Sequence, residues 1–223
     1  LGCVDIFVDK AEPKECFARM KAVVTSVMPD WVPAGALHYL AHTERGQPIR
    51  ALARAAGCHA STILRQIRRI ETRRDDPLVD AALRNLGAAQ HFLTPDLLPT
   101  QIKEIAPMAN TPQDALPDEA ALARESMRIL RRLCETGAVL AVAAEMDKAV
   151  VVRDTATGGS TRTAVVASAV AQAMALKDWI TAANTGRIIR YHITAAGRAA
   201  LAEMLAKLEG TQSSATGFAE AQT

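Results

Sequence analysis

The segment that most constrains this chain is residues 48–74, PIRALARAAGCHASTILRQIRRIETRR, which predicts two short helices joined by a tight turn. Pro48 suits the first turn of a helix, because its missing N–H is not needed there. Gly57 can adopt the positive φ that a sharp turn between two helices demands. Ala53 precedes that glycine by four residues, where two crossing helices leave room only for a small side chain. The segment therefore favours a compact pair of crossing helices.

The second of these helices, expected to begin at Ser61 or Thr62, has two distinct faces. Its apolar residues recur at helical spacing and would face the core: Ile63, Ile67 and Ile70. Its opposite stripe is polar and basic, and comprises Ser61, Arg65, Arg68 and Thr72, flanked by Arg69 and Arg73. A helix with one face for its own protein and one for a polyanion is typical of a helix-turn-helix that binds double-stranded DNA.

The charge of the chain supports this interpretation. The whole chain has a net charge of only +2, but residues 45–74 contain eight basic side chains and one acidic one, a net +7. Residues 75–120 contain two basic and eight acidic side chains, a net −6. Such a local basic block is the electrostatic footprint of a surface that binds a polyanion.

The basic stripe divides into two expected roles. Arg65 and Arg68 would contact guanine edges in the major groove, where a guanidinium matches O6 and N7. Arg69 and Arg73 would hold phosphates and contribute salt-sensitive affinity. The predicted DNA-binding set is His59, Ser61, Thr62, Arg65, Arg68, Arg69, Thr72 and Arg73. For His59, contact with a phosphate and a role in the turn are both open, whereas Cys58 is expected to be buried in the turn.

We expect a mostly α fold, with a helix-turn-helix domain at the N-terminus and a winged-helix-like α+β domain at the C-terminus. The first domain would span residues 1–87 and close with a helix from Leu78 to Leu86. Residues 88–118 contain five prolines and are expected to form an acidic linker. The second domain would span 119–209, followed by a disordered tail over 210–223.

In the second half, β-rich runs at 139–142 and 149–153 precede a predicted helix from Ala164 to Asp178. A hairpin of residues 179–182 and 188–193 and a final helix over 195–208 would follow. The predicted helix would expose Ser168, Gln172 and Ala175, with Lys177 as its cation, which is poor material for holding phosphates. Arg187 and Arg190 are candidate wing contacts to DNA, and a protein-docking role for them is equally open.

The sequence lacks the parts of an enzyme. It shows no phosphate-binding loop and no nucleophile elbow, and Gly158-Gly159 is too short a glycine run to bind phosphate. His38 and His42 are four residues apart, but no further metal ligands stand near them. We expect no catalytic site, no metal and no cofactor. No run approaches the roughly 18 apolar residues of a membrane span, and no signal peptide is visible, so we expect a cytoplasmic protein without a membrane partner.

Longer blocks of the chain resemble a known family. They are RQIRRIETRRDDPLVDAAL (65–83), GAVLAVAAEMDKAVVVR (137–153), RTAVVASAVAQAMALKDWI (162–180) and GFAEAQ (217–222). These blocks are similar to the alphaproteobacterial helix-turn-helix regulators that activate gene transfer agent clusters. In that family a further C-terminal domain follows the last block, so this chain, which ends at Thr223, is expected to lack it. Separately, RIIRYHITAAGRAAL (187–201) resembles the wing strand and following helix of MarR-like regulators.

The family resemblance implies transcriptional activation at promoter DNA and contact with RNA polymerase. The hypothesis is therefore a sequence-specific DNA-binding transcription activator, with double-stranded DNA and RNA polymerase as partners. A homodimer is left open. The alternative is an elongation or antitermination factor associated with RNA polymerase, in which the basic helix holds protein or nascent transcript.

Overall fold

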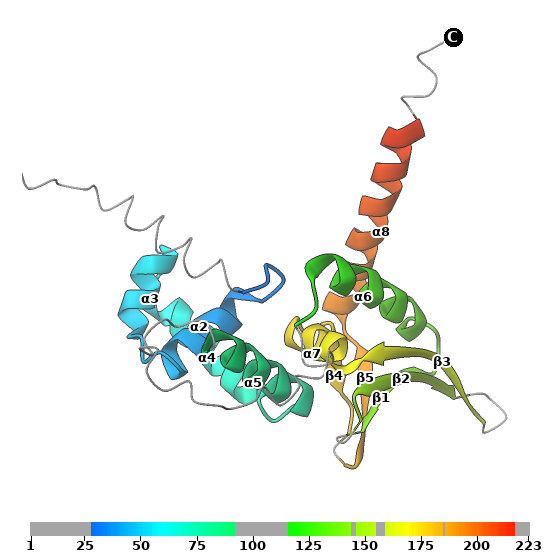
Figure 1. The fold of residues 1–223 in the computed structure, drawn as a ribbon, viewed down its shortest axis with the longest axis horizontal. Coiled ribbons are helices and arrows are strands. Elements are labelled where there is room, and N and C mark those ends of the chain that lie inside the picture. Colours follow the sequence, from blue (N-terminus) through cyan, green and yellow to red (C-terminus); the bar gives the residue numbers. More distant parts are fainter. Residues whose placement is uncertain (1–27, 92–115, 144–145, 155–158, 185, 217–223) are drawn as a thin grey trace, which may run out of the picture.

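The computed structural model describes residues 28–91, 116–143, 146–154, 159–184 and 186–216 (Figure 1). Within these residues the chain forms seven helices and one five-stranded antiparallel sheet, so the fold mixes α and β structure. All five strands belong to the second half of the chain. Residues 1–27 of the expected first domain and 92–115 of the expected linker lie outside the described residues.

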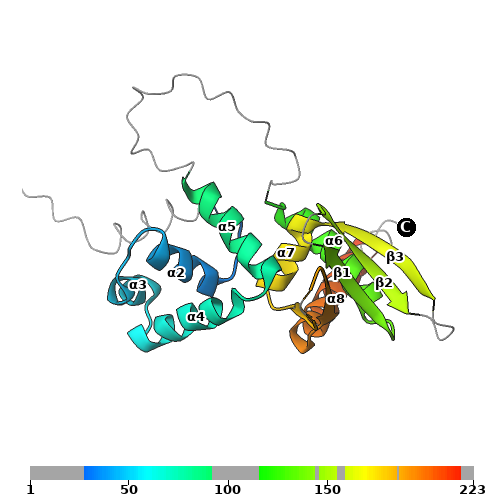
Figure 2. The ribbon, with the colours of Figure 1, turned by 90° about the horizontal axis from the view of Figure 1, so that it is seen from below.

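The first half consists of four helices, α2 (Ala34–Thr43), α3 (Ile49–Ala56), α4 (Ala60–Arg73) and α5 (Pro77–His91). Helix α2 packs against α4 and α5, and α3 packs against α4, as the grouping in Figure 2 shows. The buried side chains of this group include Leu40, Leu52, Ala53, Ile63, Ile67, Ile70, Val79 and Leu86. The predicted inward residues of α4 are thus confirmed. On α3, the helical spacing of Ile49, Leu52, Ala53 and Ala56 predicts one inward face, but Ala56 is exposed.

Helix α5 begins as the sequence predicts but ends later. The carboxylate of Asp76 accepts a hydrogen bond from the backbone N–H of Leu78 at 3.0 Å, and Pro77 occupies the first helical position. The helix then continues past its predicted end at Leu86 to His91. Gly87 is buried inside it, with the Leu40 side chain 3.8 Å from where a Cβ would stand. This glycine is therefore a packing position rather than a helix terminator.

The second half places helices over a sheet. Its elements are α6 (Glu119–Leu133), β1 (Ala138–Ala143), β2 (Lys148–Asp154), β3 (Ser160–Ala167), α7 (Ser168–Leu176), β4 (Ile180–Ala182), β5 (Ile188–Ile193) and α8 (Ala195–Thr216). The strand order is β3-β2-β1-β5-β4. Leu140 of β1 pairs with Val151 on one side and Tyr191 on the other, and all three side chains are fully buried. Helices α6 and α7 pack over the sheet, and α8 projects beyond it (Figure 1).

Two predictions for this half are wrong. Residues 164–178 do not form one helix, because the chain stays in β3 as far as Ala167 and α7 begins at Ser168. Val165 pairs with Val150 of β2, and the β-branched residues before Ala167 suit this strand. The expected disordered tail is also wrong over 210–216, since α8 continues to Thr216. A formed helix extends at little cost per residue.

The predicted hairpin is confirmed by β4 and β5, which pair from Ile180↔Ile193 to Ala182↔Tyr191. The faces of β5 alternate, with Tyr191 and Ile193 buried and Ile188 and Arg190 exposed. This alternation is that of a strand with one face on a core. None of the described helices is both long and apolar enough to cross a membrane.

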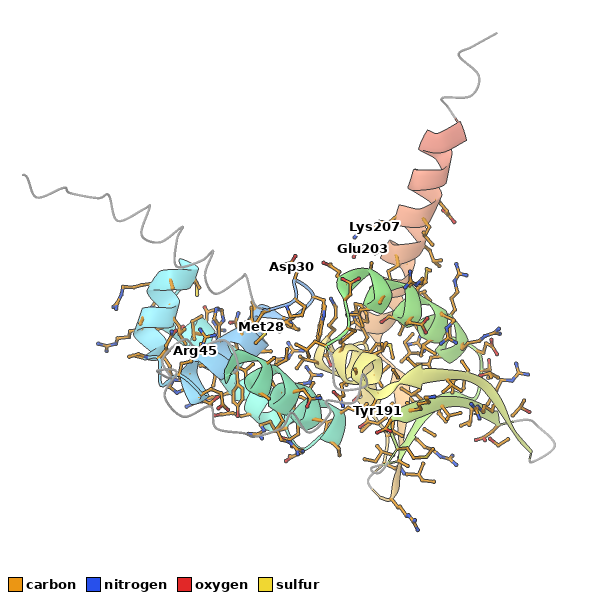
Figure 3. The ribbon with its side chains drawn as sticks, in the orientation of Figure 1. Met28, Asp30, Arg45, Tyr191, Glu203 and Lys207 are labelled. Carbon is orange, nitrogen blue, oxygen red and sulfur yellow. The ribbon has the colours of Figure 1, made fainter. Side chains whose placement is uncertain are left out.

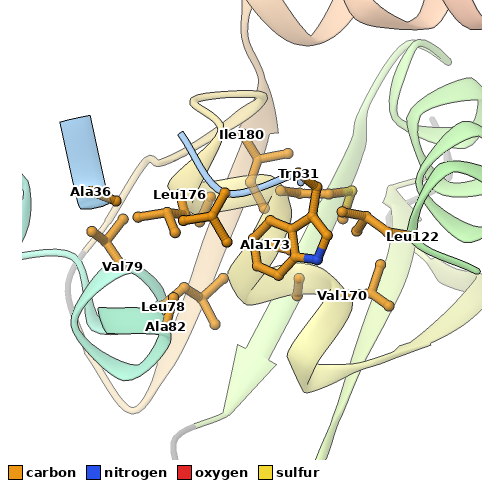
Figure 4. Packing of buried hydrophobic residues seen from close by; sticks show 14 of the residues in the cluster. Trp31, Ala36, Leu78, Val79, Ala82, Leu122, Val170, Ala173, Leu176 and Ile180 are labelled. Atoms are coloured by element: carbon orange, nitrogen blue, oxygen red, sulfur yellow. The ribbon is translucent and has the colours of Figure 1, made fainter. Parts of the chain in front are cut away.

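The two halves share one hydrophobic cluster. Leu78, Val79 and Ala82 of α5 lie against α7, where Ala173 and Leu176 are buried (Figure 4). Polar contacts between residues far apart in sequence cross the same boundary. They are Trp31 Nε1 to the Pro117 carbonyl (2.8 Å), Asn85 Nδ2 to Gln172 Oε1 (3.0 Å) and the Tyr191 hydroxyl to Asp76 Oδ1 (2.7 Å). The first-half helices are thus held by the second half as well as by their own core.

Candidate nucleic-acid interface

The turn between α3 and α4 has the geometry that the sequence suggests. Gly57 has φ +63°, and its N–H donates to the carbonyl of Ala53. The next N–H, that of Cys58, also donates to the Ala53 carbonyl, at 3.0 Å. Such bonds at a left-handed residue are the usual end of a helix. Cys58 itself is exposed, so its expected burial is wrong. The left-handed turn at Gly57 directs the Cys58 side chain away from the core, and Ala53 is the small residue buried there instead.

His59 begins α4 as its N-terminal cap. Its Nδ1 accepts a hydrogen bond from the backbone N–H of Ser61 at 3.3 Å and lies 2.8 Å from the Ser61 hydroxyl. Because Nδ1 accepts, the ring proton lies on Nε2, which can donate outward. His59 therefore fills the turn role left open by the sequence and still presents a donor at the positive end of the helix.

The outward face of α4 is polar and exposed opposite its buried isoleucines. Ser61, Arg65, Arg68 and Thr72 are all exposed, whereas Thr62 is only partly so. The Thr72 hydroxyl donates to the Arg68 carbonyl at 2.9 Å, which keeps that side chain close to its own helix. The first two turns of α4, with Ser61 and Arg65, and the neighbouring Arg68 are thus the part of the stripe best placed to reach a ligand.

The basic block divides into arginines with and without carboxylate partners. Among the described residues, no carboxylate pairs with Arg65 or Arg68. The same holds for three exposed arginines that residue-by-residue reasoning left out of the site, Arg45, Arg50 and Arg54. The last two are four residues apart and share a face of α3. Figure 3 labels Arg45 among the first-half helices. The +7 net charge of the block was the signal that could have included them.

Arg74, at the end of α4, is neutralised within the first half. Its Nε donates to Asp80 Oδ1 at 2.8 Å, and its Nη1 donates to the Tyr39 hydroxyl at 3.0 Å. The hydrogen bond from Arg74 is the main reason that the pKa of Asp80 lies below its usual value. This arginine fixes α5 to α4 and contributes little to an outward field.

The structure corrects the role of Arg73. Its guanidinium donates to the backbone carbonyls of Leu176 (3.2 Å) and Ala175, at the C-terminal end of α7. It also lies 3.6 Å from Asp178, and its side chain is only 21% exposed. A cation favourably occupies the carbonyl end of a helix. Arg73 therefore holds the two halves together rather than a phosphate, because both of its terminal nitrogens donate to α7 and its side chain is mostly covered.

Arg69 is intermediate between these groups. Its Nη2 donates to Asp178 Oδ2 at 2.7 Å, yet the side chain is 71% exposed. Exposed ion pairs contribute little and can exchange partners. Arg69 remains part of the basic face, but in the free protein its charge is partly compensated.

Helix α7 does not present the exposed face that the sequence predicted for it. Its side chains are buried at Val170, Ala171 and throughout residues 173–176, so Ala175 is not exposed as predicted. Gln172 bonds to Asn85 of the first half. Lys177 donates to the Trp31 carbonyl at 3.3 Å and lies over the Trp179 ring, and burial lowers the pKa of its amine. This helix is instead the element on which both halves pack.

The hairpin arginines form a separate group on the sheet. Arg187 is exposed, and Arg190 lies 3.8 Å from Asp154, with both side chains more than half exposed. The side chain of Asn184 accepts from the Arg190 backbone N–H at 2.7 Å and donates to the Ile188 carbonyl, which closes the hairpin. The candidate wing contacts are thus accessible, with Arg190 on β5 and Arg187 directly before that strand.

The two histidines at helical spacing have different partners. His38 Nδ1 lies 2.7 Å from Gln66 Oε1, and His42 Nδ1 donates to the Gln47 carbonyl at 2.8 Å. Within the described ranges, no three or more His, Cys, Asp or Glu side chains come together in a way that could hold a metal ion.

Comparison of the chain with protein-family models, with curated proteins and with solved structures gives no match in any of the three. The α4 face and its surroundings are therefore the features of this chain that indicate a function.

Proposed function

We propose that this protein is a sequence-specific DNA-binding transcription activator, in which α3, the Gly57 turn and α4 form a helix-turn-helix. One observation carries the proposal. Helix α4 combines a buried isoleucine face with an outward stripe where Arg65 and Arg68 are exposed and pair with no carboxylate among the described residues. A helix with this division can lie in the major groove while its other face holds it to the protein.

The chemistry assigns different tasks to the basic side chains. Arg65 and Arg68 would form bidentate contacts to guanine O6 and N7, each worth about 1–3 kcal/mol of discrimination against a wrong base. Arg45, Arg50 and Arg54 would hold phosphates, which fix the register but carry no sequence information. The His59 Nε2 proton, at the N-terminus of α4, is a further phosphate donor.

The second half would support this module and add contacts. The order of α7, the β4–β5 hairpin and α8 is that of a winged helix, with the hairpin as the wing. Because α7 is buried, the hairpin residues Arg187 and Arg190 rather than α7 would touch DNA. The resemblance to gene transfer agent activators would make the target a promoter of a phage-like gene cluster, with RNA polymerase as a partner in the cytoplasm.

The test is selection of bound duplexes from a random pool, followed by affinity measurement on the enriched sequence. We expect the wild-type chain to enrich one motif, and the Arg65→Ala/Arg68→Ala variant to lose at least about tenfold in affinity for it. The matched control is Arg124→Ala/Arg131→Ala, which removes the same charge from exposed positions of α6. If both double variants bind the motif as the wild type does, α4 does not contact the bases.

A different outcome would favour the alternative class. If the chain enriches no duplex but retains RNA polymerase in a pull-down, the protein is a polymerase-associated elongation or antitermination factor. The basic face of α4 would then hold protein or transcript.

A further inference from the structure

Asp178 stands where the second half meets the basic face of α4. It follows α7 in the turn to β4, and its carboxylate Oδ2 accepts from Arg69 Nη2 at 2.7 Å. Arg65 and Arg69 are four residues apart, so they share a face of α4. A duplex lying along the stripe would therefore reach Arg69 and, beside it, the carboxylate of Asp178.

The backbone of Asp178 is fixed in place. Its φ of +65° makes it the one residue other than glycine with positive φ among the described residues. The Asp178 N–H donates to the Ala175 carbonyl, and the following N–H, that of Trp179, donates to the Met174 carbonyl. The Asp178 carbonyl accepts from the Thr194 hydroxyl at 2.6 Å. This is the left-handed end of α7, a position that aspartate and asparagine tolerate. The carboxylate is thus presented to α4 by a well-held turn.

Arg73 does not compete for this carboxylate in the same way. It already donates to two carbonyls of α7 and is mostly covered. Arg69 is 71% exposed, and Asp178 is the one ion-pair partner recorded for it within the described ranges. Because an exposed ion pair is weak, a DNA phosphate can compete for Arg69. The phosphate would nevertheless meet the negative charge of Asp178 at that point.

We propose that Asp178 is a positioning residue that competes with DNA phosphates for Arg69, and so lowers the affinity of the protein for duplexes in general. This inference rests on the proposed function. Phosphate contacts provide nearly all of non-specific binding. When Asp178 prevents one phosphate contact, the base contacts by Arg65 and Arg68 supply a larger share of the total affinity. Asp178 therefore favours binding to the correct sequence over binding to arbitrary DNA.

The test is the salt dependence of binding to a mixed-sequence duplex, measured by fluorescence anisotropy. Asp178→Asn removes the charge but keeps a residue that accepts a positive φ. We expect the variant to bind more tightly at low salt, with a log–log salt slope steeper by about 0.9, the value for one more phosphate contact. Between about 50 and 200 mM salt it should lose about 3.5-fold more affinity than the wild type.

Two comparisons make the result specific. Glu209→Gln removes one carboxylate from an exposed position near the far end of α8 and should leave the slope unchanged. In an Arg69→Gln background, Asp178→Asn should have no effect on the slope, because the side chain that it releases is gone. Equal thermal stabilities would confirm that the variants are folded.

The outcomes separate the two proposals. If the wild type binds the duplex but Asp178→Asn behaves like Glu209→Gln, or acts equally without Arg69, the role of Asp178 is overturned and the proposed function stands. If the wild type does not bind any duplex at low salt, the proposed function fails and the role of Asp178 fails with it.

Discussion

At the first turn of α8, Gly197 packs against the backbone of the chain that precedes β4. A Cβ on this residue would stand 2.2 Å from the Trp179 carbonyl oxygen and 2.9 Å from Ile193 Cγ1. The same carbonyl oxygen accepts a hydrogen bond from the Thr194 N–H at 2.9 Å, so it cannot move freely. Thr194 in turn caps α8 by accepting from the Gly197 N–H at 3.0 Å. We therefore predict that Gly197→Ala destabilises the fold.

Two opposing effects set the magnitude. In a helix, alanine is favoured over glycine by about 1 kcal/mol. Against this, relieving the 2.2 Å contact requires a shift of roughly 0.8 Å to reach the 3.0 Å limit of real Cβ contacts. Overpacking of this kind costs about 1–3 kcal/mol, and weakening the Thr194–Trp179 hydrogen bond costs about 1 kcal/mol more. The steric effect wins, and the free energy of unfolding should fall by about 2 kcal/mol.

Urea unfolding followed by circular dichroism measures this change. The matched control is Gly35→Ala in the first turn of α2, where the nearest atoms to an added Cβ are Gln66 Cβ at 3.7 Å and Ile70 Cγ1 at 3.9 Å. That variant has room for the methyl group and should be more stable than the wild type by about 0.5–1 kcal/mol. A Gly197→Ala protein that unfolds at or above the wild-type midpoint would refute the steric argument.

Three further predictions concern single contacts. Ser126→Ala should raise the free energy of unfolding by about 1 kcal/mol in urea, because the Ser126 hydroxyl is fully buried and has no hydrogen-bond partner among the described residues. Tyr191→Phe should lower it by about 1–2 kcal/mol through loss of the bond to Asp76. Burial is the main reason that the pKa of Tyr191 is raised in the folded state. The free energy of unfolding of the wild type should therefore also fall as pH rises above about 10, and Tyr191→Phe should lack that part of the fall. Arg73→Ala should lower thermal stability but leave the salt slope of duplex binding unchanged, and a slope change of about 0.9 would return this side chain to the phosphate contacts.

Local patterns in the sequence were sufficient to predict the centre of the candidate site. The spacing of Ile63, Ile67 and Ile70 determines which face of α4 is buried, and the opposite face follows from helix geometry alone. Gly57 marks the turn because few other residues accept its positive φ.

What the sequence could not predict depends on contacts between distant residues. Arg69 and Arg73 look alike on a helical projection, but their partners lie more than 100 residues away, at the end of α7. The end of strand β3 was mistaken for the start of a helix because residues 164–167 mix alanines, which favour helices, with valines, which favour strands, and pairing with β2 decides between them. Nothing local to Gly87 shows that it packs against Leu40 within a helix.

The contact between α5 and α7 has a consequence for the modularity of the protein. Leu78, Val79 and Ala82 are buried against the second half (Figure 4). Asp76 is at once the cap of α5 and the acceptor for the Tyr191 hydroxyl. The first-half helices therefore cannot be exchanged as an independent unit. Transplanted alone, residues 28–91 would expose an apolar strip along α5, and a hybrid protein built from them would need a matched α7 to cover that strip.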